Sequence, residues 1–376
     1  MKIIYLITKW REHGGAQNHV ALLAELIQTA GHEVLVVSGP GGNPGDLPML
    51  DSIRSRVIET IGRDINLVKD SLALLSLIRL LKNEKPDLVS GHSSKAGLLG
   101  AIACKVVGVP YVYTAHSWAF LQSSSRLRNT GYLFLWKTFG RLVGHVICVS
   151  DFDQRKALEY SILPRHRIST VHNGLLDLEY GPNPVSQLSE HVKGISIGRL
   201  AQPKDFPFLV SVIAETKHLY LDIVGEGPQK RRLKDLIEYH GLEDRVRLLG
   251  GRQDVPELIE KYDFVVLISN SEGLPLVVLE GMRAMKPVVG SLVGGISEAI
   301  VDGETGYLVE IGDNKTLSLY LTELTTNSDL RLKMGNAGRE RFLKFFLAEK
   351  MLSKTIMIYE ATIDKHKKTM LESSSL

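Results

Sequence analysis

The chain has 376 residues, of which 44% are hydrophobic and 23% charged, and its formal net charge is +3 at pH 7. This composition is that of a folded globular protein and excludes a disordered or fibrous chain. A single hydrophobic core rarely grows beyond about 250 residues, so the length predicts two domains with a cleft between them. The small net charge argues against a nucleic-acid partner, because such proteins carry a basic stripe or a much higher pI.

The amino terminus predicts a first β-strand. One lysine precedes a short apolar run at residues 3–7, which is too short for the hydrophobic region of a signal peptide. The best candidate for a membrane span, residues 97–107, is interrupted by Lys105 and falls short of the roughly 18 apolar residues required. Cys104 and Cys148 lie in apolar stretches without metal-ligand spacing, so we expect buried thiols, no metal site and a cytoplasmic protein.

Short apolar runs alternate with amphipathic stretches along the chain, a pattern typical of buried parallel strands between helices. The first series of runs lies at residues 3–7, 34–37, 87–89, 111–113 and 146–149, and the second at 195–197, 219–224, 245–249, 264–268 and 288–289. Between the two series, residues 179–194 lack apolar periodicity and predict a linker. We therefore predict an α/β fold of two Rossmann-like domains, 1–178 and 195–350, facing each other across a cleft. Residues 351–376 are expected to form a carboxyl-terminal helix with a frayed tail.

The segment 118–150 departs from this rhythm, because it has no acidic residue and its basic residues alternate with aromatic ones. The basic residues are Arg126, Arg128, Lys137 and Arg141, and the aromatic ones Tyr132, Phe134, Trp136 and Phe139. Two interpretations remain open: a core helix with a solvated basic face, or a surface that contacts anionic lipid at the inner face of the cell membrane.

Three turns after predicted strands carry candidate ligand-binding residues. Gly14 and Gly15 follow the first strand and would let a ligand approach the backbone, although the pattern lacks the spacing of a dinucleotide-binding fingerprint. Gly225 occupies a similar turn in VGEGP. In GRLAQPKDF, Arg199 and Lys204 follow the first strand of the second domain, where open α/β sheets bind ligands, and two cations there would neutralise a diphosphate.

The stretch SNSEGLPLVVLEGM at residues 269–282 predicts a strand end, a turn and a buried helix. Pro275 suits the first helical turn, which leaves the amides of residues 276–278 available to an anion such as a diphosphate. Glu272 precedes the helix and Glu280 lies inside it, so the two carboxylates would accept hydrogen bonds from hydroxyl groups at both ends of a ligand. Their apolar surroundings indicate that these carboxylates have partners.

Five ordered blocks together resemble glycosyltransferase family 4, of the GT-B fold. EGLPLVVLE matches the family's two glutamates with seven residues between them, and GRL with the later lysine matches its phosphate-binding pair. Three further blocks follow the family's order: HNG at 172–174, VGEGP at 224–228 and PVVGSLVGGISEAIVDGETGYLV. The resemblance implies a catalytic role for His116, Arg199, Lys204 and Glu272. It further implies donor binding by Gly14, Gly15, Arg199, Lys204, Gly225, Gly273, Leu274, Pro275, Leu276, Val277 and Glu280, and acceptor binding by Lys95 and Trp118.

Two departures from the family pattern lie beside the motif residues. Asp205 follows Lys204 where a glycine is frequent, and Lys286 precedes PVV where a glycine is common. We expect both to bear on donor choice more than on activity.

The resemblance implies a retaining, metal-independent enzyme without cofactor. Such an enzyme moves a hexose or N-acetylhexosamine from a UDP- or GDP-sugar to a glycan or polyprenyl-diphosphate-linked acceptor in bacterial surface polysaccharide biosynthesis. The leaving diphosphate would take the proton of the acceptor in a front-face substitution. The alternatives are a nucleotide-sugar epimerase or phosphorylase of the same architecture, and a catalytically silent subunit that binds a sugar nucleotide and activates a partner.

Overall fold

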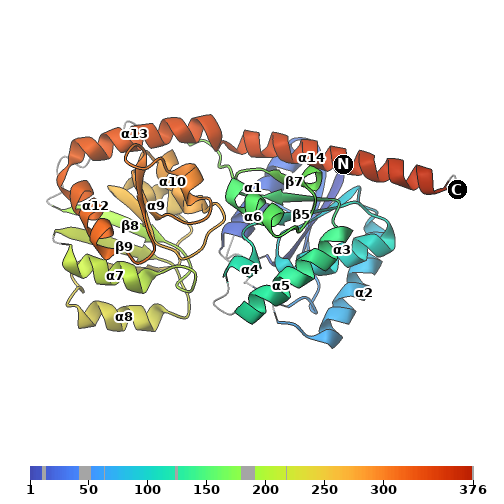
Figure 1. The fold of residues 1–376 in the computed structure, drawn as a ribbon, viewed down its shortest axis with the longest axis horizontal. Coiled ribbons are helices and arrows are strands. Elements are labelled where there is room, and N and C mark those ends of the chain that lie inside the picture. Colours follow the sequence, from blue (N-terminus) through green and yellow to red (C-terminus); the bar gives the residue numbers. More distant parts are fainter. Residues whose placement is uncertain are drawn as a thin grey trace. The chain divides into compact units, whose positions relative to one another are not determined.

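The chain forms two compact units in the computed structural model, which describes residues 1–10, 14–41, 52–62, 64–122, 126–178, 191–216 and 218–374. Unit 1 comprises Met1–His172 and Glu349–Leu376, and unit 2 comprises Asn173–Ala348 (Figure 1). Residues 173–178, expected in the first domain, belong to unit 2 because side chains of that unit bind them: Arg339 pairs with Asp177 at 2.6 Å, and Arg283 donates to the carbonyl of Leu176. Most of the predicted linker lies outside the described residues.

Unit 1 is a doubly wound parallel sheet whose described strands run in the order β3-β2-β1-β4-β5-β6-β7. Its strands are β1 Lys2–Lys9, β2 Glu33–Gly39, β3 Ser55–Val57, β4 Leu88–Gly91, β5 Tyr111–Ala115, β6 His145–Cys148 and β7 Ile168–Thr170. Its helices are α1 Gly15–Thr29, α2 Leu67–Glu84, α3 Ser94–Val107, α4 Ala119–Gln122, α5 Arg126–Phe139 and α6 Asp151–Glu159, with short 3-10 turns at Gly140–Leu142 and Arg165–Arg167. The strands are apolar on both faces because helices cover both, as the continuous hydrophobic runs predict.

Unit 2 repeats this architecture with a sheet of the order β10-β9-β8-β11-β12-β13. Its strands are β8 Val192–Ile197, β9 Leu219–Val224, β10 Val246–Gly250, β11 Phe264–Leu267, β12 Val288–Ser291 and β13 Gly306–Val309. Its helices are α7 Phe206–Glu215, α8 Lys230–Tyr239, α9 Val255–Glu260, α10 Leu276–Arg283, α11 Ile296–Ala299, α12 Asn314–Thr326 and α13 Ser328–Phe345. Strand β8 begins at Val192, so the end of the predicted linker is already part of the sheet.

The carboxyl-terminal helix α14, Ala348–Ser374, packs on unit 1 over most of its length (Figure 1). Tyr359 is fully buried among β1 and β4, and His366 shares a hydrogen bond of 2.9 Å with the carbonyl of Gly108. Helix α14 continues as far as Ser374, beyond the hydrogen bond of His366, and fraying of the tail stays a prediction.

The basic aromatic segment is divided into α4, α5 and β6. Trp136 is buried, whereas Phe134 and Leu127 are 70% and 87% exposed on α5. The side chain of Arg126 lies outside the described residues, and Arg128, Lys137 and Arg141 are exposed. Among the described residues, no helix is long and apolar enough to cross a membrane. Cys104 and Cys148 are buried, as predicted, and burial raises the pKa of both thiols.

Candidate functional site

In unit 2 the candidate residues gather at the topological switch point of the sheet, where the strand order reverses. This switch point lies at the carboxyl ends of the adjacent strands β8 and β11. One chain segment leaves β8 toward β9 and the other leaves β11 toward β12, which opens a crevice between the two turns. The turns are tied together by an antiparallel bridge between Lys204 and Ser269 and by a hydrogen bond of 2.9 Å from the amide of Asp205 to the carbonyl of Ile268.

Lys204 and Glu272 form an ion pair in this crevice. The ammonium of Lys204 lies 2.6 Å from Oε1 of Glu272, and the two side chains are only 15% and 13% exposed. The structure thus brings together a predicted phosphate ligand and a predicted sugar ligand, which are 68 residues apart in the chain. Each charge neutralises the other.

Arg199 lies on the same edge of unit 2, one residue beyond Gly198, and its side chain is exposed. No hydrogen bond or ion pair joins its guanidinium to another residue of the described ranges. Beside it, Gly225 has φ +148°, and a Cβ there would lie 1.9 Å from the carbonyl oxygen of Gly198. Gly225 is therefore required for the close approach of two loops at the ends of β8 and β9, which holds the backbone next to Arg199 in place.

Helix α10 begins at Leu276, with Pro275 as its N-cap and without a side-chain cap. The amide of Val278 donates to the carbonyl of Pro275 at 3.3 Å, so this amide is engaged and the prediction that it remains available is wrong. The amides of Leu276 and Val277 remain uncapped at the positive end of the helix dipole. Glu280 is half-buried on α10, and its burial raises the pKa of its carboxyl above the ordinary value.

The turn between Glu272 and α10 is braced from two directions. The amide of Gly295 donates to the carbonyl of Gly273 at 2.6 Å, and Nδ2 of the buried Asn173 donates to the carbonyl of Leu274 at 2.6 Å. Gly294 has φ +55° and packs so closely on the backbone of Glu272 that a Cβ would lie 1.8 Å from its carbonyl oxygen. The backbone around Glu272 is thus fixed before any ligand arrives.

The corresponding point in unit 1 is the crevice at the carboxyl ends of β1 and β4. Gly14 is the N-cap of α1, in extended backbone at φ 179°, and α1 has no side-chain cap. At Gly15 a Cβ would meet nothing within 4 Å, so space is open beside the first turn of the helix. At Gly14 a Cβ would lie 2.5 Å from Oε1 of Gln17, and the approach of a ligand to the backbone of both glycines stays a prediction.

Three histidines meet beside this crevice. His92 follows β4, His116 follows β5 and His19 lies in α1, with ring centroids 4.8 to 5.6 Å apart. Nδ1 of His92 lies 3.2 Å from Nε2 of His116. Burial is the main cause that lowers the pKa of His92 and of His116 well below the ordinary value, and the neighbouring imidazoles add to it. His92 and His116 are therefore neutral at pH 7.

A cavity of about 470 Å³ adjoins the same crevice of unit 1. Its wall is largely apolar and aromatic, formed by Ile65, Leu98, Tyr132, Leu135, Trp136 and Phe139, while Thr8, His92, Ser93 and Lys95 supply polar groups. The ammonium of Lys95 is bound by Asp70 at 2.6 Å and by the carbonyl of Asp64. Lys95 thus lines the cavity, as an acceptor-binding residue would, but its charge is already balanced.

Trp118 does not contribute to an accessible site. It is 1% exposed, its indole N–H donates to the carbonyl of Asp153 at 2.9 Å, and its ring packs against Tyr113, Phe120 and Trp136. The prediction that Trp118 binds the acceptor is therefore wrong. Trp118 follows a strand, but its side chain packs in the hydrophobic core of unit 1.

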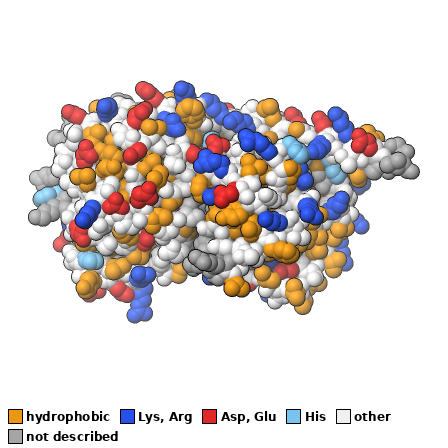
Figure 2. Space-filling view, in the orientation of Figure 1, with side chains coloured by type: hydrophobic (Ala, Val, Ile, Leu, Met, Phe, Trp, Pro, Cys, Tyr) orange, Lys and Arg blue, Asp and Glu red, His pale blue; other side chains and the backbone are white. Residues whose placement is uncertain are grey.

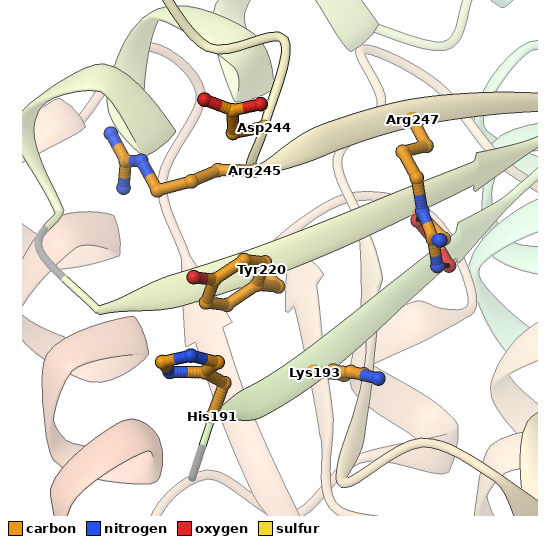
Figure 3. A pocket seen from close by; sticks show the side chains of 7 residues that line it. His191, Lys193, Tyr220, Asp244, Arg245 and Arg247 are labelled. Atoms are coloured by element: carbon orange, nitrogen blue, oxygen red, sulfur yellow. Dashed lines mark hydrogen bonds and ion pairs between the residues drawn. The ribbon is translucent and has the colours of Figure 1, made fainter.

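Unit 2 has a second, smaller pocket of about 210 Å³ at the amino ends of its strands, away from the candidate residues. Figure 3 shows side chains of His191, Lys193, Tyr220, Asp244, Arg245 and Arg247 around it. Arg247 is held by both carboxylate oxygens of Asp222 at 2.8 and 2.6 Å, and Arg245 donates to the carbonyl of Thr216. These cations are engaged in structural contacts, so this pocket does not resemble a diphosphate site.

The two departures from the family pattern have different consequences. Asp205 is the N-cap of α7 and accepts from the amide of Phe208, beside the Lys204 turn. Lys286 is buried just before the amino end of β12, opposite the carboxyl edge that carries the site. The expectation that Lys286 bears on donor choice is therefore wrong, because its side chain lies at the opposite end of the strands from the site.

Several supporting residues were not identified from the sequence. Asn173 braces the Glu272 turn, and His92, Ser90 and Tyr359 lie behind His116. The position of His92 directly after a buried strand was a signal, because strand ends at the carboxyl edge carry ligands. No local pattern marks Tyr359, which reaches the sheet from the last helix of the chain.

Comparisons with known proteins agree with this geometry. Residues 13–176 match the family model described as Glycosyltransferase Family 4, and residues 188–341 match that of Glycosyl transferases group 1. A similar protein is the UDP-Gal:alpha-D-GlcNAc-diphosphoundecaprenol alpha-1,3-galactosyltransferase of Escherichia coli, 30% identical over 82% of this chain and 84% of the relative. The O-antigen biosynthesis glycosyltransferase WbnH of Escherichia coli is 30% identical over 82% of this chain and 86% of its own length.

Solved structures share the fold at lower identity. HepE of Anabaena, in complex with UDP and glucose, has a TM-score of 0.82 at 21% identity, covering 95% of this chain and 98% of its own. Sucrose-phosphate synthase of Thermosynechococcus elongatus has a TM-score of 0.85 at 20% identity, covering 97% and 100%. Two family models match the chain, two relatives are 30% identical over 82% of it, and both units are doubly wound sheets of the GT-B type. The chain therefore belongs to glycosyltransferase family 4.

Proposed function

We propose that this glycosyltransferase is a retaining enzyme that transfers a hexose or N-acetylhexosamine from a nucleoside-diphosphate sugar to a lipid-linked or glycan acceptor in bacterial surface polysaccharide biosynthesis. The observation that carries this proposal is the pairing of Lys204 with Glu272 at the switch point of unit 2. Beside them lie an exposed arginine and two uncapped helix amides. This set holds the donors that a diphosphate requires and the acceptor that a sugar hydroxyl requires.

The chemistry follows from where charge develops. As the bond between the anomeric carbon and the diphosphate oxygen breaks, negative charge grows on that oxygen, and Arg199, Lys204 and the amides of Leu276 and Val277 stabilise it. The same oxygen takes the proton of the acceptor hydroxyl as the new glycosidic bond forms on the same face, so configuration is retained. Glu272 accepts hydrogen bonds from the sugar, and Glu280 from the ribose of the nucleotide.

UDP is the favoured nucleotide of the donor, with GDP as the alternative. The E. coli relative uses UDP-Gal by its printed name, and HepE was solved with UDP. A thermal-shift panel of UDP- and GDP-sugars tests this, because a ligand at about 100 times its Kd adds roughly 2.7 kcal/mol of stability. A shift with GDP-sugars alone would contradict the UDP donor, and no shift with any sugar nucleotide would contradict the donor site.

Retention and transfer are tested together by NMR of the product anomeric proton, with a polyprenyl-diphosphate-linked sugar as acceptor and the UDP-sugar as donor. An α-configured donor should give an α-linked product. Inversion would overturn the mechanism, and conversion of the nucleotide-sugar without acceptor would indicate an epimerase.

We further propose that transfer needs no metal ion or cofactor. Arg199 and Lys204 already supply two positive charges to the diphosphate, which is the role a divalent cation would otherwise play. Carboxylates are the ligands that Mg²⁺ prefers, and the paired aspartates at 151–153 are partly committed: Asp153 is buried and accepts from the hydroxyl of Ser150 in the N-cap of α6. Transfer should persist in excess EDTA; its loss, with recovery on adding Mg²⁺, would contradict this proposal.

The acceptor side is proposed to work at an anionic membrane surface. On α2 the side chains of Leu67, Val68, Leu72 and Leu75 are 49 to 80% exposed, and Phe134 on α5 is 70% exposed. Figure 2 shows hydrophobic side chains over the part of unit 1 where Figure 1 draws α2 and α5. The exposed basic residues of these helices are Lys69, Arg79, Lys82, Arg128 and Lys137, each worth about 1 kcal/mol at an anionic surface.

Cosedimentation with vesicles of phosphatidylcholine and phosphatidylglycerol tests this surface. Replacing Leu72 and Leu75 together by Glu should weaken binding at least about tenfold, since it removes apolar area and adds repulsion. Leu319→Glu, at a 63% exposed leucine on α12 of unit 2, is the matched control. Equal binding of all three proteins, or no binding at low salt, would contradict the membrane proposal.

A further inference from the structure

A row of hydrogen bonds runs from the carboxyl-terminal helix through the sheet of unit 1 to His116. The hydroxyl of Tyr359, on α14, donates to Oγ of Ser90 at 2.9 Å. Oγ of Ser90 lies 3.1 Å from Nε2 of His92, and Nδ1 of His92 lies 3.2 Å from Nε2 of His116. Tyr5 on β1 stands behind the row, with its hydroxyl 3.5 Å from that of Tyr359.

Water cannot substitute for these contacts, because Tyr359 and Ser90 are fully buried and His92 is 2% exposed. A buried hydroxyl or imidazole needs its protein partner to satisfy each donor. Both imidazoles are neutral near pH 7, since burial lowers the pKa of His92 and of His116. A neutral imidazole has one N–H donor and one acceptor nitrogen, so each ring must choose which nitrogen bears the proton.

The row determines that choice. Tyr359 donates to Ser90, so the hydrogen of the Ser90 hydroxyl must find another acceptor, and Nε2 of His92 is within reach. His92 then carries its proton on Nδ1 and donates it to Nε2 of His116. His116 in turn carries its proton on Nδ1. Among the described residues, no other hydrogen bond of the His116 ring competes with this arrangement.

We propose that Tyr359, Ser90 and His92 are positioning residues that hold His116 as the tautomer with its proton on Nδ1, ready to donate to a substrate oxygen. The inference rests on the proposed function and on the catalytic role that the family resemblance implies for His116, namely contact with the transferred sugar. It goes beyond that function, because it assigns a purpose to buried polar groups of β4 and α14 that touch no substrate. The last helix of the chain thereby sets the state of a catalytic side chain.

The tautomer is measured by NMR on the full chain labelled with ¹⁵N-histidine at pH 8, without any ligand. His116 is assigned by the signal that disappears in His116→Gln, and its long-range ¹H–¹⁵N couplings show which nitrogen bears hydrogen. We expect the proton on Nδ1 in the wild-type protein and a mixture of tautomers in Ser90→Ala. A wild-type proton on Nε2, or an unchanged tautomer in Ser90→Ala, would overturn the proposal.

Steady-state transfer separates positioning from general loss of structure. Ser90→Ala should lower kcat roughly 10- to 100-fold with the donor KM within about threefold of wild type, and Ser90→Thr should restore most of it because it keeps the hydroxyl. Tyr359→Phe should have a smaller effect in the same direction. Recovery that fails in a folded Ser90→Thr protein, or an effect on KM alone, would count against positioning.

Two matched variants control for removal of a buried hydroxyl from the same unit. Ser38→Ala removes a hydroxyl on β2 that bonds the carbonyl of Gly39, and Tyr111→Phe removes one that bonds the carbonyl of Gly97. Both should keep the His116 tautomer and wild-type kcat. A shift of the tautomer in either control would also contradict the proposal. The NMR result without ligand stands apart from transferase activity, so loss of the proposed function and loss of this inference are distinguishable.

Discussion

Units 1 and 2 share one architecture and differ in the chemistry at its switch point. In both, two adjacent strands send the chain in opposite directions, β1 and β4 in unit 1 and β8 and β11 in unit 2. The switch point of unit 2 carries the ion pair of Lys204 and Glu272, whereas that of unit 1 carries neutral histidines beside an apolar cavity. The fold supplies the same crevice twice, and by our proposal the side chains suit the crevice of unit 2 to a charged diphosphate and that of unit 1 to an uncharged or apolar group.

The largest expected effect is at the ion pair. Lys204→Ala and Glu272→Ala should each lower kcat/KM by roughly 10³-fold, because each removes a ligand contact and leaves its mostly buried partner charge without a counterion. Lys193→Ala, at an exposed lysine near the amino end of β8, is the matched control and should keep activity. Circular dichroism and thermal melts confirm folding. Turnover near the wild-type value in either site variant would contradict the comparison of the two units.

The sequence was sufficient to predict ten of the thirteen described strands, the two-unit α/β fold and the position of Lys204 and Glu272 directly after strands of the second domain, but not the ion pair between them. These features depend on local patterns, namely apolar runs for strands and polar residues directly after them. The burial of Trp118 and the role of Tyr359 were out of reach, because they depend on which distant helices pack together. The engaged amide of Val278 could not be foreseen either, since Pro275 serves as N-cap rather than as a residue of the first turn.

A smaller loss is expected at the histidine of unit 1. His116→Ala should lower kcat about 100-fold, since one hydrogen-bond donor to the reacting sugar is removed while the diphosphate contacts remain. Donor affinity, measured by titration calorimetry with UDP, should stay within about threefold. His32→Ala, at a histidine near the start of β2, serves as control. Loss of UDP affinity comparable to that of Lys204→Ala would show that the division of labour between the units is wrong.

Lowering the pH should change the stability of the two units in opposite directions. Burial lowers the folded-state pKa of His92 and His116, and that of His145 to about 4, so folded unit 1 binds fewer protons than the unfolded chain below pH 6.5. Its stability should therefore fall as the pH drops from 6.5 toward 4. In unit 2 burial raises the pKa of Glu280, so the folded state binds this proton more tightly than the unfolded chain. Glu280 therefore increases the free energy of unfolding of unit 2 as the pH falls through its folded pKa.

Tryptophan fluorescence reports on unit 1 alone, because Trp10, Trp118 and Trp136 are the three tryptophans of the chain and all lie in that unit. The urea midpoint read by fluorescence should decrease between pH 6.5 and 4.5, and less so in His145→Gln, which lacks one of the titrating groups. A fluorescence midpoint that stays constant over this range would contradict the neutral state of the buried histidines.

The smallest effect is expected at Lys95, and it sharpens the contrast between the cations of the two units. Arg199 is exposed and makes no ion pair with another described residue, whereas Lys95 is held by Asp70 at 2.6 Å. To bind an acceptor phosphate, Lys95 must share a charge that Asp70 already balances, so the net gain is small. Lys95→Met should raise the acceptor KM less than about tenfold, and Arg199→Met should raise the donor KM more.

Asp70→Asn releases the Lys95 charge and should lower the acceptor KM if that acceptor carries a diphosphate, while leaving it unchanged for an uncharged glycan. A 100-fold loss in Lys95→Met would instead place a main anion site in unit 1 and remove the distinction between the two switch points.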